Sequence, residues 1–109
     1  MTNYKTYKEI PGAIINRKNF KGSSVEGAVR SDWYYIYSYD TIIGIVLAND
    51  AGLVLNVHHY SPTTSKIQNI LRRIFDDAPI YEVNPTGKTL HQNNMAMINK
   101  ADDVAISDY

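Results

Sequence analysis

The chain has 109 residues, a length that fits a single domain over 1–109. It has 11 Lys or Arg against 11 Asp or Glu, and the resulting formal net charge of zero argues against a general polyanion binder. Its 44% hydrophobic and 20% charged residues are typical of a globular domain, and the absence of cysteine excludes a disulfide scaffold, a zinc-thiolate site and a cysteine nucleophile. No apolar run approaches the roughly 20 residues that span a bilayer, and no signal-peptide segment opens the chain, so we expect a cytoplasmic protein.

The first thirty residues give weak structural signals. Residues 1–11 are polar with scattered tyrosines and end at Pro11-Gly12, a turn signal, which predicts a loosely held arm. Ala13-Ile14-Ile15 predicts a short strand because it is rich in β-branched residues. Val25 to Arg30 predicts a second strand, which contains Gly27.

The segment from 32 to 58 carries the strongest strand signals. Trp33 to Tyr39 alternates with a period of two, as a pleated strand does. Thr41 to Leu47 is apolar on both faces, which suits a central strand covered on both sides. Asn49 to Gly52 has turn chemistry, and Leu53 to Val57 follows as a third strand. These patterns predict an antiparallel meander.

A helix is predicted over 62–75. Ser61 is a suitable N-cap, and Pro62 suits the first helical position. Apolar residues then recur at helical spacing and form one stripe: Ile67, Ile70, Leu71, Ile74 and Phe75. We expect this stripe to lie across one face of the meander and the helix to end near Phe75, before Pro79.

The C-terminal third is less regular. Ile80 to Val83 alternates and predicts another strand, Leu90 to Lys100 predicts a short helix, and the acidic segment 101–109 is expected to fray. The fold class predicted is α+β, with an antiparallel sheet of four to five strands and one amphipathic helix, about 62–75, on one face.

No catalytic or metal-binding pattern stands out in the sequence. His58 and His59 are adjacent, so on a strand they point to opposite faces, and His91 has no partner at ligand spacing. A Ser-His-Asp set can be written from Ser61, His58 and Asp50, but no nucleophile-elbow motif supports it. The chain also lacks phosphate-binding glycine motifs. We therefore expect no enzymatic activity, no cofactor and no metal.

Two surfaces are candidates for binding. The strand residues Trp33, Tyr35, Tyr37 and Tyr39 would form an aromatic row that packs under the helix or faces outward, where it could stack bases or contact a protein. Together with the basic helix residues Lys66, Arg72 and Arg73, this row is the basis of a nucleic-acid-binding alternative.

Charge is distributed unevenly along the chain. Residues 1–30 carry six basic and two acidic residues, residues 31–75 are balanced, and residues 76–109 carry two basic and six acidic residues. This gradient favours docking against a charged protein surface, with acidic residues replacing phosphates. The residues predicted to contact that partner are Asp76, Asp77, Glu82, Asp102, Asp103 and Tyr81.

Three segments carry a family resemblance: Asn19-Phe20-Lys21-Gly22-Ser23-Ser24, Tyr35-Ile36-Tyr37-Ser38-Tyr39-Asp40-Thr41, and Tyr60-Ser61-Pro62-Thr63-Thr64-Ser65-Lys66-Ile67-Gln68-Asn69. Together they resemble a family of small phage and prophage proteins of Gram-positive bacteria, in which a histidine is common where this chain has Ile67. Some members are similar to anti-CRISPR inhibitors. The resemblance implies a non-enzymatic inhibitor that binds a host defence protein, most specifically a type II CRISPR effector nuclease, inside the bacterial host.

Overall fold

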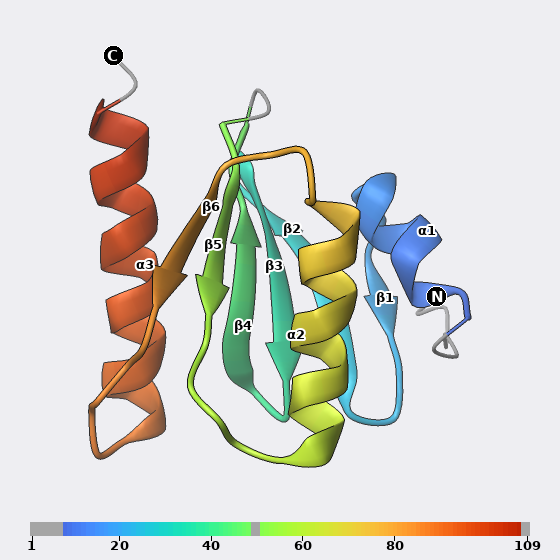
Figure 1. Ribbon diagram of the computed structural model, residues 1–109, viewed down its shortest axis with the longest axis horizontal. Helices are drawn as coiled ribbons and strands as arrows, with labels where there is room; N and C mark the ends of the chain where they lie inside the picture. Colours follow the sequence, from blue (N-terminus) through green and yellow to red (C-terminus); the bar gives the residue numbers. More distant parts are fainter. Residues whose placement is uncertain (1–7, 49–50, 108–109) are drawn as a thin grey trace.

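A computed structural model describes residues 8–48 and 51–107 and shows an α+β fold, with one six-stranded sheet between helices on its two faces (Figure 1). The elements in chain order are α1 (Ile10–Ile15), β1 (Phe20–Lys21), β2 (Val25–Arg30), β3 (Trp33–Ser38), β4 (Thr41–Val46), β5 (Leu53–Asn56), α2 (Pro62–Ile74), β6 (Ile80–Val83) and α3 (Leu90–Ser107). The α+β class predicted from the sequence is confirmed.

The sheet is mixed rather than antiparallel. Its strands lie in chain order from β1 to β6, and each pair from β1 to β5 is antiparallel, so the meander is confirmed. The pair β5–β6 is parallel. The reason is the intervening helix, which carries the chain back so that β6 starts at the same end as β5. Within residues 8–48 and 51–107 the fold has six strands and three helices, where the prediction was an antiparallel sheet of four to five strands with one helix on one face.

The central helix α2 begins and ends as predicted. The Ser61 hydroxyl accepts a hydrogen bond from the backbone N–H of Thr64 at 3.2 Å, Pro62 is the first helical residue, and Phe75 is the C-cap. Ile67, Ile70 and Leu71 are buried against the sheet. This packing fixes the face of the sheet that α2 covers.

The strand predicted at Ala13-Ile14-Ile15 is wrong, because these residues belong to α1. Ile10, Ala13 and Ile14 are buried in the core that α2 also covers. Burial of this helical stripe outweighs the strand preference of the two isoleucines. Ile10 is fully packed, so the loosely held arm does not extend to it; residues 1–7 lie outside the described residues.

A second core lies under α3 on the opposite face, where Met97, Ala101 and Val104 pack against strand residues. Residues 101–107, expected to fray, therefore continue α3 instead, because Ala101 and Val104 anchor them; residues 108 and 109 are outside the described residues. None of the helices in the described ranges has the length and hydropathy needed to cross a membrane.

Tyr34 lies in the first core, and its burial makes the folded state less stable at alkaline pH. Its side chain is fully buried and its hydroxyl donates to the Lys18 carbonyl at 2.8 Å. Burial raises the pKa of Tyr34 above its ordinary value. Because the unfolded tyrosine ionises near pH ~10 and the folded one later, unfolding releases a proton above that pH. Stability from this group is complete below pH ~10 and is lost as pH rises further.

We expect Tyr34→Phe to reduce the loss of stability above pH ~10 by up to about 1.4 kcal/mol per pH unit. It should also cost about 1 kcal/mol at neutral pH, because the hydrogen bond to Lys18 is lost. Urea unfolding between pH 7 and pH 11 measures both effects. Tyr39→Phe, at an exposed tyrosine, is the control. The same alkaline slope in wild type and Tyr34→Phe would contradict the assignment.

Candidate binding surface on the sheet

The two faces of the sheet are covered unequally. On one face α1 and α2 pack over the first core, whereas on the other α3 alone packs against β4, β5 and β6. The β1–β3 side of that second face lies beside α3. Strand register places seven residues on it: Lys21, Glu26, Ala28, Arg30, Trp33, Tyr35 and Tyr37.

The aromatic row lies on this face, away from α2. The Tyr35 and Tyr37 rings are stacked with centroids 6.1 Å apart, and the Trp33 ring is tilted 6.4 Å from Tyr35. Tyr35 is only 9% exposed and belongs to the second core, whereas Trp33 and Tyr37 are half-buried. The row is therefore continuous, and its two ends reach solvent.

Tyr39 does not belong to the row. Its φ is +48° and that of Asp40 is +70°, so the two residues form the turn between β3 and β4 instead of extending β3. The Tyr39 side chain is 64% exposed. The alternation in the sequence continues through Tyr39, but β3 ends at Ser38 and Tyr39 begins the turn.

A cation and an anion flank the aromatic row. The Arg30 guanidinium carbon on β2 lies 5.7 Å from the Tyr37 ring centroid, a cation–π distance. Asp102 lies on α3, on the other side of β3. Burial raises the pKa of Tyr35, the charges of Tyr37 and Asp102 raise it further, and Arg30 lowers it. Both flanking charges therefore act on the same ring.

We call this surface the aromatic step. Its floor is Trp33, Tyr35 and Tyr37 on β3, with Arg30 at its outer side, and its wall is Ile98 and Asp102 on α3. Ile98 packs partly buried against the same core as the three rings. Arg30 and Ile98 are not among the site residues predicted from the sequence. The hairpin pairing of β2 with β3 is the signal that places Arg30 beside the row.

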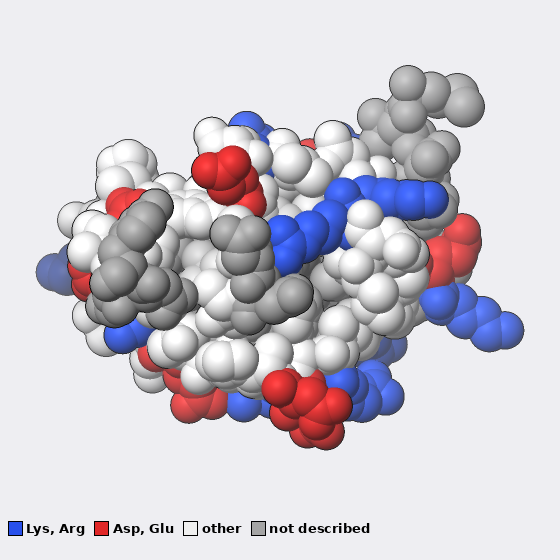
Figure 2. All heavy atoms as spheres, turned by 90° about the horizontal axis from the view of Figure 1, so that it is seen from above, with Lys and Arg blue, Asp and Glu red and all other residues white. Residues whose placement is uncertain are grey.

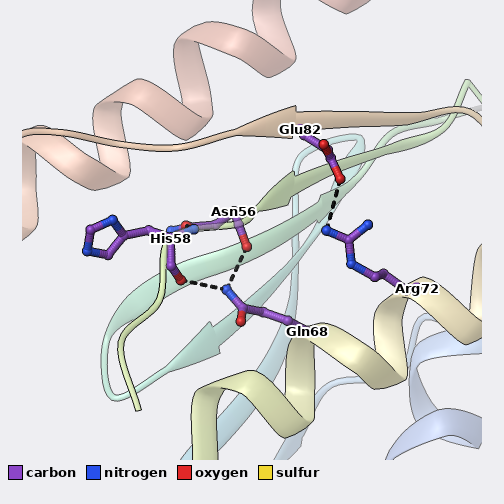
Figure 3. A network of polar contacts seen from close by, with 5 residues as sticks. All are labelled: Asn56, His58, Gln68, Arg72 and Glu82. Atoms are coloured by element: carbon purple, nitrogen blue, oxygen red, sulfur yellow. Dashed lines mark hydrogen bonds and ion pairs between the residues drawn. The ribbon is translucent and has the colours of Figure 1, made fainter. Parts of the chain in front are cut away.

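The predicted basic helix face is divided in the structure. Arg72 forms an ion pair with Glu82 on β6 at 2.9 Å, as Figure 3 shows. Lys66 and Arg73 instead line a groove of about 490 Å³ between α1 and α2, together with Pro11, Ile70 and Ile74. All three cations belong to the helix on the face opposite the aromatic row, so the row and the basic residues do not form one surface.

The predicted acidic partner site is also divided. Asp76 and Asp77 are exposed in the turn after α2, and Glu82 faces α2. Tyr81 packs on the other side of β6 with the second core, and Asp102 and Asp103 lie on α3. Viewed from above, acidic and basic side chains alternate in small groups (Figure 2). These residues do not form a continuous phosphate-like patch.

The charge gradient along the sequence is nevertheless also a gradient across the sheet. Because the strands lie in chain order, residues 8–30 occupy one edge of the sheet and residues 76–107 the other. The first group has five basic and two acidic residues, and the second has two basic and five acidic residues. The two edges of the described structure therefore carry opposite net charge.

The histidine region is organised around buried Asn56. The Asn56 side-chain amide donates to the Ile42 carbonyl at 3.1 Å and to the Tyr60 hydroxyl at 2.9 Å, and its oxygen accepts from the His58 N–H at 3.0 Å. Gln68 on α2 donates to the carbonyls of Asn56 and His58 at 2.7 and 2.9 Å (Figure 3). These bonds join α2 to the end of β5.

The residues of the possible Ser-His-Asp set have other partners. His58 Nδ1 lies 3.0 Å from the Asn84 side-chain oxygen, and its ring meets Tyr60 edge-on at 4.7 Å. Ser61 caps α2, and Asp50 lies outside the described residues. Across 8–48 and 51–107, His, Asp and Glu side chains form no group of three that could hold a metal ion.

The aromatic step is thus the surface that combines half-buried aromatic rings with charges of both signs. Comparisons of the chain with protein-family models, with curated proteins and with solved structures gave no match.

Proposed function

We propose that this protein is a non-enzymatic binding protein that docks another protein through the aromatic step. The observation that carries the proposal is the half-buried Trp33 and Tyr37 with Arg30 against the Tyr37 ring. Trp, Tyr and Arg are the residues most enriched among those that dominate protein–protein binding energy. Their rings are held by the second core, so little side-chain freedom is lost on binding.

The charges around the step favour a protein over a nucleic acid. Arg30 and Lys21 are balanced by Glu26 and Asp102, so the surface has no net charge. Non-specific nucleic-acid binding needs an excess of cations to replace the counterions of the phosphates. Tyr35, at the centre of the row, is also too buried to stack a base on its face.

The partner that we propose is a host defence protein, specifically a type II CRISPR effector nuclease whose activity or nucleic-acid binding is blocked. Support comes from the resemblance of three segments to phage proteins. Two of these segments, 19–24 and 35–41, contribute to β1 and β3, the edge strand and the floor of the aromatic step, and the third begins α2. The segment 35–41 therefore contributes Tyr35 and Tyr37 to the aromatic step, whereas the third segment lies on the opposite face of the sheet.

Trp33→Ala is expected to weaken nuclease binding by about 30-fold or more, as loss of a central aromatic contact does. The purified protein is titrated into purified type II effector nucleases, with co-elution and protection of target DNA from cleavage as readouts. Tyr39→Ala is the matched control, because it removes an exposed aromatic ring outside the step.

Absence of a complex and of DNA protection for every nuclease tested would exclude the nuclease as partner. Equal losses for Trp33→Ala and Tyr39→Ala would exclude the step as the surface. Binding to single-stranded DNA or RNA that falls steeply with salt and is lost in Tyr37→Ala would instead establish the nucleic-acid alternative.

A further inference from the structure

The helix α3 is apolar on more than its buried side. Met97, Ala101 and Val104 face the sheet, but Met95 is 37% and Ile106 is 69% exposed. Asn94, Ile98, Asp102 and Ile106 follow one another at four-residue intervals and therefore form one row along the helix.

This row begins on the side of α3 that meets β3 and β4. The Asn94 side chain accepts from the Ile42 N–H at 2.8 Å and donates to the Asp40 carbonyl at 3.1 Å, so it is held by the β3–β4 hairpin. Ile98 then contacts the second core and Asp102 acts on Tyr35. The row turns by about 40° at each four-residue step, so it starts beside the sheet at Asn94 and ends at Ile106 on the outer side of α3, where Ile106 is exposed.

The step is also asymmetric in charge. Arg30 lies on the β2 side of β3, and Asp102 lies on the α3 side. Both are exposed. The Arg30 guanidinium lies over the Tyr37 ring, roughly 10 Å along β3 from its turn with β4, and Asp102 lies roughly 12 Å along α3 from Asn94, which is bonded at that turn, so the two charges lie at a similar level. A surface with opposite charges on the two sides of an apolar strip can complement itself if a rotation exchanges the sides.

We propose that the aromatic step pairs with the same step of a second copy of this chain, around a two-fold axis parallel to β3. This rotation exchanges the two sides of the strip, so Arg30 of each copy faces Asp102 of the other. It also lays each α3 over the β1–β2 region of the second copy, where Met95 and Ile106 lose their exposure. A two-fold axis across β3 would instead bring the two Arg30 side chains together, which is unfavourable.

The pairing concerns the surface used in the proposed function, so the second copy and the protein partner compete for it. Only this competition rests on the proposed function; the pairing itself rests on the charges and apolar residues of the step. A dimer would keep the surface covered until a partner binds.

Charge reversal tests the pairing. Arg30→Glu and Asp102→Arg each place like charges in contact across the axis, so each variant is expected to dimerise at least 10-fold more weakly than wild type. Mixed in equal amounts, the two variants are expected to dimerise with each other, because both contacts then join opposite charges. Lys100→Glu, a charge reversal at a half-buried residue on a different side of α3, is the control and should leave the dimer unchanged.

Sedimentation velocity at concentrations from about 1 µM to about 1 mM gives the association constants. The fluorescence of Trp33, the only tryptophan in the chain, reports burial of the step directly. Circular dichroism of each variant establishes that it is folded. A wild-type protein that stays monomeric throughout, or variants that stay monomeric when mixed, would overturn the pairing.

The outcomes separate this inference from the proposed function. A monomer that binds and inhibits the nuclease refutes the pairing and leaves the proposed function intact. A dimer that is lost in the single variants and regained on mixing, in a protein that binds no nuclease, establishes the pairing and refutes the nuclease as partner.

Discussion

Gly27→Ala is expected to lower the free energy of unfolding by about 3 kcal/mol, from overpacking and a disturbed buried hydrogen bond. Gly27 lies between Phe20 and Ile36 in the sheet, and a Cβ at this position would collide with the Tyr34 hydroxyl and the Phe20 ring. Tyr34 is fully buried and bonded to Lys18, so it has no room to move aside. Urea unfolding measures the loss.

Gly12→Ala is the matched control for this substitution. Gly12 lies in α1, and a Cβ there would meet no atom within 4 Å apart from its chain neighbours and the backbone of its own helix. Alanine is favoured over glycine inside a helix, so this variant should gain about 0.5–1 kcal/mol. A Gly27→Ala protein as stable as wild type would show that the Phe20–Tyr34 contact tolerates an added methyl group and would contradict the prediction.

Asn56→Ala is the second substitution with a large expected effect, also about 3 kcal/mol. Asn56 is fully buried, and its loss removes the side-chain partners of the Ile42 carbonyl and the His58 N–H at once. Buried polar groups left without partners incur the full cost of lost hydration. The residue therefore holds the segment 58–60, which connects β5 to α2, against β4.

Thermal or urea unfolding measures the effect, and hydrogen exchange of the His58 amide shows whether its bond is the one lost. Asn69→Ala, at an exposed asparagine on α2, is the control and should change stability by less than about 0.5 kcal/mol. If both variants unfold at the same urea concentration, the network around Asn56 contributes nothing to stability.

The meander and α2 were predictable because their signals are local. Alternation over Trp33 to Ser38 and the apolar run of Thr41 to Val46 each specify a strand without reference to the rest of the chain. The Ser61-Pro62 pair and the stripe that follows it specify where α2 begins and which side it buries.

The two terminal helices, α1 and α3, were harder to predict, although the sequence of each contains a helical signal. Ile10, Ala13 and Ile14 have helical spacing, but the two adjacent isoleucines favour a strand. Before α3, Thr89 and Gln92 form a capping box: the Thr89 hydroxyl accepts from the Gln92 N–H at 3.1 Å, and Gln92 Oε1 accepts from the N–H of Lys88 at 2.7 Å and of Thr89 at 3.3 Å. Apolar residues on two sides of α3 blur its period.

The parallel pairing of β6 follows from the order strand, helix, strand, which brings the chain back to its starting end.

The aromatic step has no comparable local signal. Its floor comes from β3, its cation from β2 and its wall from α3, so it exists only once register and helix packing are known. Tyr39 shows the limit of prediction from alternation alone. Its sequence position continues the aromatic row, but the residue lies in the turn after β3 and is therefore outside the row.

The order of the strands also bears on how the chain folds. Each strand from β1 to β5 pairs with its neighbour in the sequence, and the pair β5–β6 requires the longest closure, across α2. Local pairing of this kind lowers the entropy lost before native contacts form, and domains rich in such contacts fold quickly. The sheet can thus grow outward from the β3–β4 hairpin, with β6 added only after α2 has formed.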